Sequence, residues 1–135
     1  MIDGITHFTR YVPDLDQALS FYRDVLGLHV RADNVVAPGM RWLTVGTPDG
    51  TGPELVLMNP RDWMTNAEQR DATLASLAVQ PTLVLRTPDA DALLARLKSV
   101  HADLEFDEVR SLPWGRDLVF RDPSGSSVNA VEPVA

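Results

Sequence analysis

The chain has 135 residues, the size of one ordinary domain or of two small modules that share a core. Its 12 Lys and Arg against 19 Asp and Glu give a net charge of -7, which argues against nucleic acid or an anionic membrane as partner, because both require a cationic surface. Cysteine is absent, which excludes disulfides, thiolate catalysis and cysteine-ligated zinc, and no segment approaches the roughly 20 apolar residues that span a bilayer. The N-terminus has no signal-peptide pattern, so we expect a cytoplasmic protein.

The first half of the chain predicts a strand, a helix and three more strands. Residues 5–12 have strand composition, and Asp14, after Pro13, is a good helix N-cap. Apolar side chains at i, i+3, i+4 and i+7 then predict an amphipathic helix that ends at Gly27. Three short strands are expected after it, at residues 28–35, 41–46 and 54–58, the last two joined by a turn at Pro48-Asp49-Gly50.

The second half predicts the same order of elements after a connector. Residues 66–79 form a weakly amphipathic helix or a partly ordered connector, which serves as a covering helix, a lid or a dimer contact. A strand at 83–86 precedes a helix that Asp89 caps. Further strands are expected near residues 104–109, 116–120 and 128–132.

One fixed offset of 75 residues relates the two halves. It aligns Pro13-Asp14-Leu15-Asp16 with Pro88-Asp89-Ala90-Asp91, and Thr47-Pro48-Asp49-Gly50 with Asp122-Pro123-Ser124-Gly125. The chain therefore reads as two copies of a βαβββ module, about 5–60 and 80–135, with a connector at 61–79, in one domain.

The residues that carry a family resemblance are His7, Val12-Pro13-Asp14-Leu15, Phe21-Tyr22, Leu26-Gly27, Glu54-Leu55 and Phe120-Arg121-Asp122-Pro123-Ser124-Gly125. With the doubled βαβββ pattern, they make the chain resemble the vicinal oxygen chelate superfamily, which includes glyoxalase I, extradiol dioxygenases, fosfomycin resistance enzymes and bleomycin resistance proteins. The resemblance implies an α+β fold in which two modules with curved mixed sheets form a cleft, and it implies a homodimer. A shared fold does not decide the chemistry.

The resemblance also implies metal ligands at the start of the first strand and in the fourth strand of each module. In the first module these are His7 and Glu54, whose imidazole and carboxylate suit divalent transition metals. The offset of 75 places Thr82 and Asn129 at the matching positions of the second module, and neither is a strong metal ligand. We therefore expect no cofactor, and a weakly held divalent metal is the alternative.

His7 and Glu54 have two interpretations without a metal. In the first, His7 is a pocket-lining or core histidine hydrogen-bonded to a neighbour, and Glu54 is a partly buried carboxylate that His7 or an arginine pairs with. In the second, the two form a catalytic general-base pair. His29 and His101 are expected at the surface.

Aromatic and arginine residues recur at matching places in the two modules. Arg41 and Trp42 begin the third strand of the first module, and Trp114 and Arg116 stand at the same place in the second. The tryptophans suit stacking against a planar or cationic ligand, and the arginines suit a carboxylate or phosphate. Alternatively, Trp42 belongs to the core and the arginines are solvated edge residues.

These features predict a small-molecule-binding protein with a metal-poor, aromatic-lined cleft, and the acidic net charge favours a basic ligand. The residues predicted to contact that ligand are Arg41, Trp42, Thr82, Trp114, Arg116 and Asn129. The alternative is a metal-dependent lyase, isomerase or dioxygenase that uses His7 and Glu54. A third hypothesis is a protein that binds an intermediate of a neighbouring pathway. Besides its ligand, the expected partner is a second copy of the chain.

Overall fold

The computed structural model describes residues 1–134, which divide into two compact units. The first unit is Met1–Leu77 and the second begins at Ala78, so the boundary falls inside the predicted connector. Each unit combines one mixed sheet with helices, which confirms the predicted α+β class. No helix within the described residues is both long and apolar enough to cross a bilayer.

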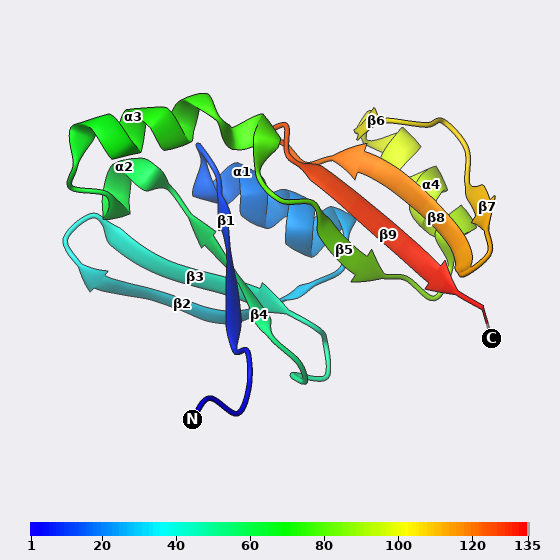
Figure 1. The fold of residues 1–135 in the computed structure, drawn as a ribbon, viewed down its shortest axis with the longest axis horizontal. Coiled ribbons are helices and arrows are strands. Elements are labelled where there is room, and N and C mark those ends of the chain that lie inside the picture. The colour runs from blue at the N-terminus through cyan, green and yellow to red at the C-terminus, as the bar shows by residue number, and fades with distance from the viewer. Residues whose placement is uncertain (135) are drawn as a thin grey trace. The chain divides into compact units, whose positions relative to one another are not determined.

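The sheet of the first unit has four strands in the order β1-β4-β3-β2 (Figure 1). β1 runs parallel to β4, while β3 is antiparallel to both β4 and β2. The strands are β1 His7–Tyr11, β2 His29–Ala37, β3 Met40–Gly46 and β4 Glu54–Met58. The predicted strands are confirmed, with β1 shorter than expected and β4 at the predicted bounds.

The predicted helix follows β1 as two segments of different winding. α1 spans Leu15–Leu19, and the Asp14 carboxylate caps it by accepting the backbone N–H of Gln17 at 3.0 Å. The chain then continues as η1, a π-helical segment over Ser20–Val25, and Gly27 follows it with a φ of 82°. Apolar spacing predicted this helix and its stop, but it does not distinguish α from π winding.

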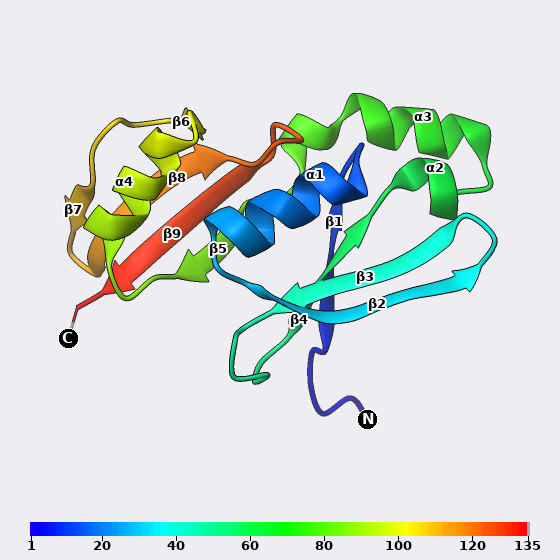
Figure 2. The same ribbon diagram turned by 180° about the vertical axis from the view of Figure 1, so that it is seen from behind.

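The core of the first unit lies between this helix and one face of the sheet (Figure 2). The side chains buried in it come from every second position of β3 and β4 and from the apolar side of the helix. They include Leu15, Ala18, Phe21, Tyr22, Leu43, Val45, Leu55 and Leu57. The intervening positions of β3 and β4 lie on the face opposite the helix, and two of them, Thr44 and Val56, are also buried, at 0% and 2% exposed.

Short helices connect the two sheets. α2 is Pro60–Trp63, α3 is Ala67–Ala75, and a 3-10 turn, η2, follows at Leu77–Val79. Asn66 caps α3 by accepting the N–H of Gln69 at 2.9 Å, and α3 contributes no buried residue. The expected connector helix is confirmed, but its role as a cover, lid or dimer contact stays a prediction.

The sheet of the second unit has the order β5-β9-β8-β6, and β7 also pairs with β8. β5 is parallel to β9, and the other pairs are antiparallel. The elements are β5 Leu83–Arg86, α4 Ala90–Ser99, β6 Asp103–Leu104, β7 Arg110–Leu112, β8 Gly115–Arg121 and β9 Ser127–Pro133. Asp89 caps α4 as predicted, accepting the N–H of Ala92 at 3.0 Å.

The prediction of one strand at residues 104–109 is wrong. The chain bends over residues 105–108, and the strand is replaced by two short pieces, β6 and β7, that pair with different parts of β8. The physical reason is composition, because Glu105, Asp107 and Glu108 have poor strand propensity.

α4 covers one face of the second sheet, as Figure 1 shows. The buried side chains between them include Ala90, Leu97, Leu118, Phe120, Val128 and Ala130. The other face of this sheet, on the alternate positions of β8 and β9, is not covered by α4.

An ion pair repeats in the two units. Arg41 Nη1 lies 2.8 Å from Asp16 Oδ1, and Arg116 Nη2 lies 2.8 Å from Asp91 Oδ1. Both residues of the second pair lie 75 positions after those of the first. Each pair joins the first turn of a helix to a strand of the sheet that the helix covers. The predicted offset of 75 residues therefore relates individual side-chain contacts as well as elements.

Candidate functional site

The uncovered face of the first sheet brings together His7, Trp42 and Glu54. His7 and Glu54 are directly paired residues of the parallel strands β1 and β4, so their side chains leave the sheet side by side. Trp42 lies on β3, one position from Leu43 in the core, and therefore points to the same uncovered face. Strand alternation thus assembles three residues that are far apart in the sequence.

His7 and Glu54 lie close together but are separated by more than a direct hydrogen bond. His7 Nε2 is 3.8 Å from Glu54 Oε1, and both side chains are about a third exposed, at 39% and 32%. Glu54 Oε1 accepts the Thr44 hydroxyl at 2.6 Å, and His7 Nδ1 lies 2.9 Å from Thr6 Oγ1. The pair has the proximity that the sequence predicted, and Thr44 fixes the carboxylate.

Three aromatic rings stand in series on this face. The Trp42 ring centroid lies 5.8 Å from that of His7, with 57° between the planes, and 6.1 Å from that of Trp63, with 69°. Such tilted and edge-on contacts are the arrangements that aromatic quadrupoles favour. Trp63 lies within the connector predicted at 61–79, and no sequence pattern assigned it a role.

Trp63 could have been placed from its neighbours. Asn59 accepts the N–H of Arg61, and Pro60 occupies the first position of α2, which is the usual start of a helix. That one-turn helix follows β4 directly and brings Trp63 back to β3. The indole Nε1 of Trp63 is buried and has no hydrogen-bond partner among the described residues.

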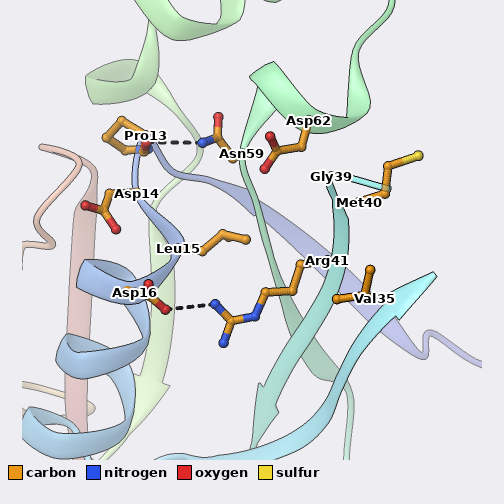
Figure 3. Close-up of a pocket in the computed structure, with 10 residues that line it drawn as sticks. All are labelled: Pro13, Asp14, Leu15, Asp16, Val35, Gly39, Met40, Arg41, Asn59 and Asp62. Atoms are coloured by element: carbon orange, nitrogen blue, oxygen red, sulfur yellow. Dashed lines mark hydrogen bonds and ion pairs between the residues drawn. The ribbon is translucent and has the colours of Figure 1, made fainter. Parts of the chain in front are cut away.

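Arg41 lies on the other face of the same sheet. Its guanidinium binds Asp33 at 2.8 Å on the neighbouring strand. It also binds Asp16 at 2.8 Å on the helix, as Figure 3 shows. These carboxylates raise the pKa of Arg41 well above its ordinary value, Asp33 more than Asp16, against the opposing effect of desolvation. Its predicted ligand-binding role stays a prediction, since the guanidinium is occupied by two carboxylates.

Arg41 borders a cavity of about 380 Å³ on that helix-covered side. The cavity is lined by Pro13, Asp14, Leu15, Asp16, Val35, Gly39, Met40, Arg41, Asn59 and Asp62 (Figure 3). Its ionisable lining is three carboxylates and one guanidinium. It is separate from the His7 and Trp42 surface, which lies across the sheet.

In the second unit, the predicted residues are distributed over several environments. Thr82 is exposed directly before β5, and Asn129 lies on β9 on the face that α4 leaves uncovered. Trp114 stands in the turn between β7 and β8 with 61% of its surface exposed. Arg116 points to the helix side, where it binds Asp91 and Glu132.

A charged network that the sequence analysis missed surrounds Asn129. Asp117 is only 2% exposed, and both of its carboxylate oxygens accept hydrogen bonds from Arg110, each at 2.8 Å. The Asn129 amide also donates to Asp117 at 2.9 Å and to the Leu118 carbonyl at 3.0 Å. The Arg110 hydrogen bonds hold the pKa of Asp117 below its ordinary value although burial opposes them.

A sequence signal for this network existed. Arg110 and Asp117 are equally far from the two-residue turn at Pro113-Trp114, and residues at equal distances from such a turn face each other across a hairpin. Opposite charges directly across a hairpin stabilise it.

The donor set does not fit a tightly held metal ion. Within residues 1–134, no three His, Asp or Glu side chains gather where they could hold one ion. His7 and Glu54 supply two strong ligands. At the matching positions, Thr82 offers a hydroxyl and Asn129 an amide oxygen, both of which are neutral and weaker ligands for transition metals than an imidazole or a carboxylate. A protein site for a catalytic metal usually supplies three protein ligands.

Comparisons with known proteins agree on one family. The model of the Glyoxalase/Bleomycin resistance protein/Dioxygenase superfamily matches residues 4–129. The structure of UcmS2 is 30% identical with a TM-score of 0.85, over 98% of this chain and 99% of that one. TnmS3, described as an antibiotic binding protein from Streptomyces sp. CB03234, is 28% identical with a TM-score of 0.74, over 98% of each chain. The uncharacterized protein YetH of Bacillus subtilis is 26% identical over 93% of this chain and 95% of its own length.

Proposed function

Because the chain belongs to the Glyoxalase/Bleomycin resistance protein/Dioxygenase superfamily, we propose that it binds a small organic molecule on the sheet face that carries His7, Trp42 and Trp63. The observation that carries the proposal is the series of three aromatic rings on the sheet face opposite α1 and η1. Aromatic faces of this kind bind planar ligands by stacking, with little loss of conformational freedom.

The likeness to TnmS3 supports binding without conversion of the ligand. That relative is described as an antibiotic binding protein, and it matches this chain over nearly its whole length. We propose by analogy that the ligand here is an antibiotic-like molecule with a conjugated ring system. The two-ligand donor set is consistent with a site that holds its ligand without metal chemistry.

An enzyme is the second candidate, and one observation favours it. The imidazole of His7 lies 3.8 Å from the Glu54 carboxylate that Thr44 fixes, which is close enough for that charge to stabilise a protonated His7. In this candidate His7 accepts a proton from a bound substrate, and Glu54 stabilises the resulting imidazolium.

A homodimer and cytoplasmic residence belong to the same proposal. β1 and β5 are edge strands of their sheets, and an exposed edge is commonly covered by a second chain. Light scattering coupled to size exclusion tests the dimer, and cell fractionation tests the location.

A thermal-shift assay with bleomycin and the planar anthracycline doxorubicin as probes tests the binding function, with and without added Ni²⁺ or Mn²⁺. A ligand that binds the folded protein raises the unfolding temperature. We expect a rise with at least one probe, its loss in Trp42→Ala, and its retention in Val100→Ala, which alters an exposed apolar residue at the C-terminal end of α4.

The outcomes separate the two candidates. A shift that is unaffected by Trp42→Ala contradicts the proposed surface. A shift that requires metal and disappears in His7→Ala favours the enzyme.

A further inference from the structure

The uncovered face of the second sheet carries a row of residues with an unusual charge pattern. Backbone pairing places Arg86 of β5 beside Val131 of β9, Val131 beside Asp117 of β8, and Asp117 beside Arg110 of β7. The two arginines therefore flank the row across three inter-strand spacings, roughly 14 Å in all.

A small cavity of about 230 Å³ opens at the Arg86 end of this row. Its lining is Val84, Leu85, Arg86, Val131 and Pro133. The side chain of Val84 is 67% exposed, so apolar surface is available to a ligand there. Arg86 is the charged member of the lining, and it makes no hydrogen bond or ion pair within residues 1–134.

Arg110, at the other end, is held in a fixed position. Its Nε and Nη2 bind the buried Asp117, which Asn129 also holds, and its guanidinium carbon lies 4.5 Å from the Phe106 ring centroid. Nη1 has no hydrogen-bond partner within residues 1–134, and 35% of the side chain is exposed. A guanidinium fixed in this way can bind a further acceptor at low entropic cost.

The carboxylates near this row leave it with a surplus of positive charge. Asp117 neutralises Arg110, so the unpaired charge is that of Arg86. Glu132 lies on the opposite face, where it binds Arg116. Asp107 and Glu108, in the bends before β7, form no ion pair with Arg110. Salt screens the interaction between exposed charges beyond about 8 Å. A ligand bound to this face is therefore affected more by the nearby arginines than by the net negative charge of the whole chain.

We propose that this face recognises an anionic group, such as a carboxylate, phenolate or sulfonate, on a ligand whose apolar body rests on Val84 and Val131. Arg86 supplies the unpaired charge, and Arg110 supplies the oriented donor. The inference rests on the proposed small-molecule function, and it replaces the basic ligand that the net charge suggested.

Two fluorescent dyes of nearly the same shape test the inference. Anilinonaphthalene sulfonate carries an anionic group, and N-phenylnaphthylamine lacks it. We expect the wild-type protein to bind the sulfonate more tightly. Arg86→Gln should weaken sulfonate binding about tenfold, the equivalent of one charge-assisted hydrogen bond, and should change binding of the neutral dye less than twofold.

Two further variants keep the experiment decisive. Arg110→Lys retains a positive charge beside Asp117 but lacks the planar guanidinium with its several N–H donors. This variant should bind the sulfonate several-fold more weakly while its circular dichroism spectrum remains native. Arg96→Gln is the matched control, because Arg96 is an exposed arginine of α4. It removes the same charge from the other side of the same sheet and should change neither dye's affinity.

Each result has a distinct meaning. If both dyes bind equally, or if Arg86→Gln affects them equally, the anionic specificity is wrong while small-molecule binding stands. An equal effect of Arg96→Gln shows a general charge effect and also overturns the inference. If neither dye binds and the antibiotic probes also give no thermal shift, the proposed function itself fails.

Discussion

Asp117 offers the sharpest test of how the second unit is held together. The substitution Asp117→Asn keeps the shape of the side chain but removes the charge that Arg110 binds at two 2.8 Å contacts. The new amide group also places N–H donors against those of Arg110 and Asn129. Hydrogen bonds to a charged group contribute about 1.5–3 kcal/mol. Because Arg110 is partly exposed and regains water, we expect a loss near the lower end, about 2 kcal/mol.

The pH dependence of this loss has a definite sign. Arg110 lowers the pKa of Asp117 in the folded protein, against the effect of burial. A carboxyl group with a lowered pKa stabilises the fold fully above its unfolded-state pKa of about 3.9, and this contribution disappears as the pH falls through the folded-state pKa. The difference in unfolding free energy between wild type and Asp117→Asn is therefore largest at neutral pH and shrinks below about pH 4.

Urea unfolding followed by circular dichroism at pH 7, 5 and 3 measures this difference. The matched control is Asp103→Asn, which alters an ion pair with Arg121 in the same unit but at a side chain that is 66% exposed. We expect the control to cost about 0.5 kcal/mol or less. The reasoning is refuted if the two variants lose equal stability, or if the loss in Asp117→Asn is the same at pH 3 as at pH 7.

Three further predictions concern single backbone or turn positions. The carboxyl group of Asp49 should titrate with a pKa of about 2 in an NMR experiment, because Thr51 and Thr47 donate hydrogen bonds to it, and Thr51→Ala should raise that pKa toward its ordinary value. His101→Gly should raise the unfolding free energy by about 0.5–1 kcal/mol, since His101 has a φ of 55° after α4; a loss of stability would contradict this. Gly115→Ala should cost about 2 kcal/mol or more in urea unfolding, because its φ is 149° and a Cβ would collide with the carbonyl oxygen of Glu132, whereas Gly4→Ala, in open space, should be neutral.

The sequence predicted what depends on local pattern and on the repeat. Strand composition, the Asp14 and Asp89 caps and the stop at Gly27 gave the βαβββ order of both units, because each of these is a property of a few neighbouring residues. The pairing of His7 with Glu54 was also within reach, since the resemblance placed them at the sites of two ligands of one metal ion.

What the sequence did not predict depends on packing between separate elements. Trp63 reaches Trp42 only because α2 turns back toward β3, and the break of the second module's strand at 105–108 accompanies the Phe106 contact with Arg110. Arg41 and Trp42 were treated as one ligand-binding segment, yet strand alternation sends their side chains to opposite faces. Alternation is a local rule, so this last distinction could have been drawn in advance.

The repeat allows the two faces of each sheet to be compared position by position. On the faces that the helices cover, the Arg41–Asp16 and Arg116–Asp91 pairs keep the same chemistry at positions 75 residues apart.

On the opposite faces two matching positions differ, since Trp42 corresponds to Asp117 and Glu54 to Asn129, whereas Val56 and Val131 agree. A covered face is constrained by packing in both units, whereas an open face can change its side chains without disturbing the core. The divergence is therefore expected where a ligand is bound, with an aromatic surface in one unit and a guanidinium-bearing surface in the other. Exchanging Trp42→Asp should accordingly impair binding of the planar probes more than it impairs folding.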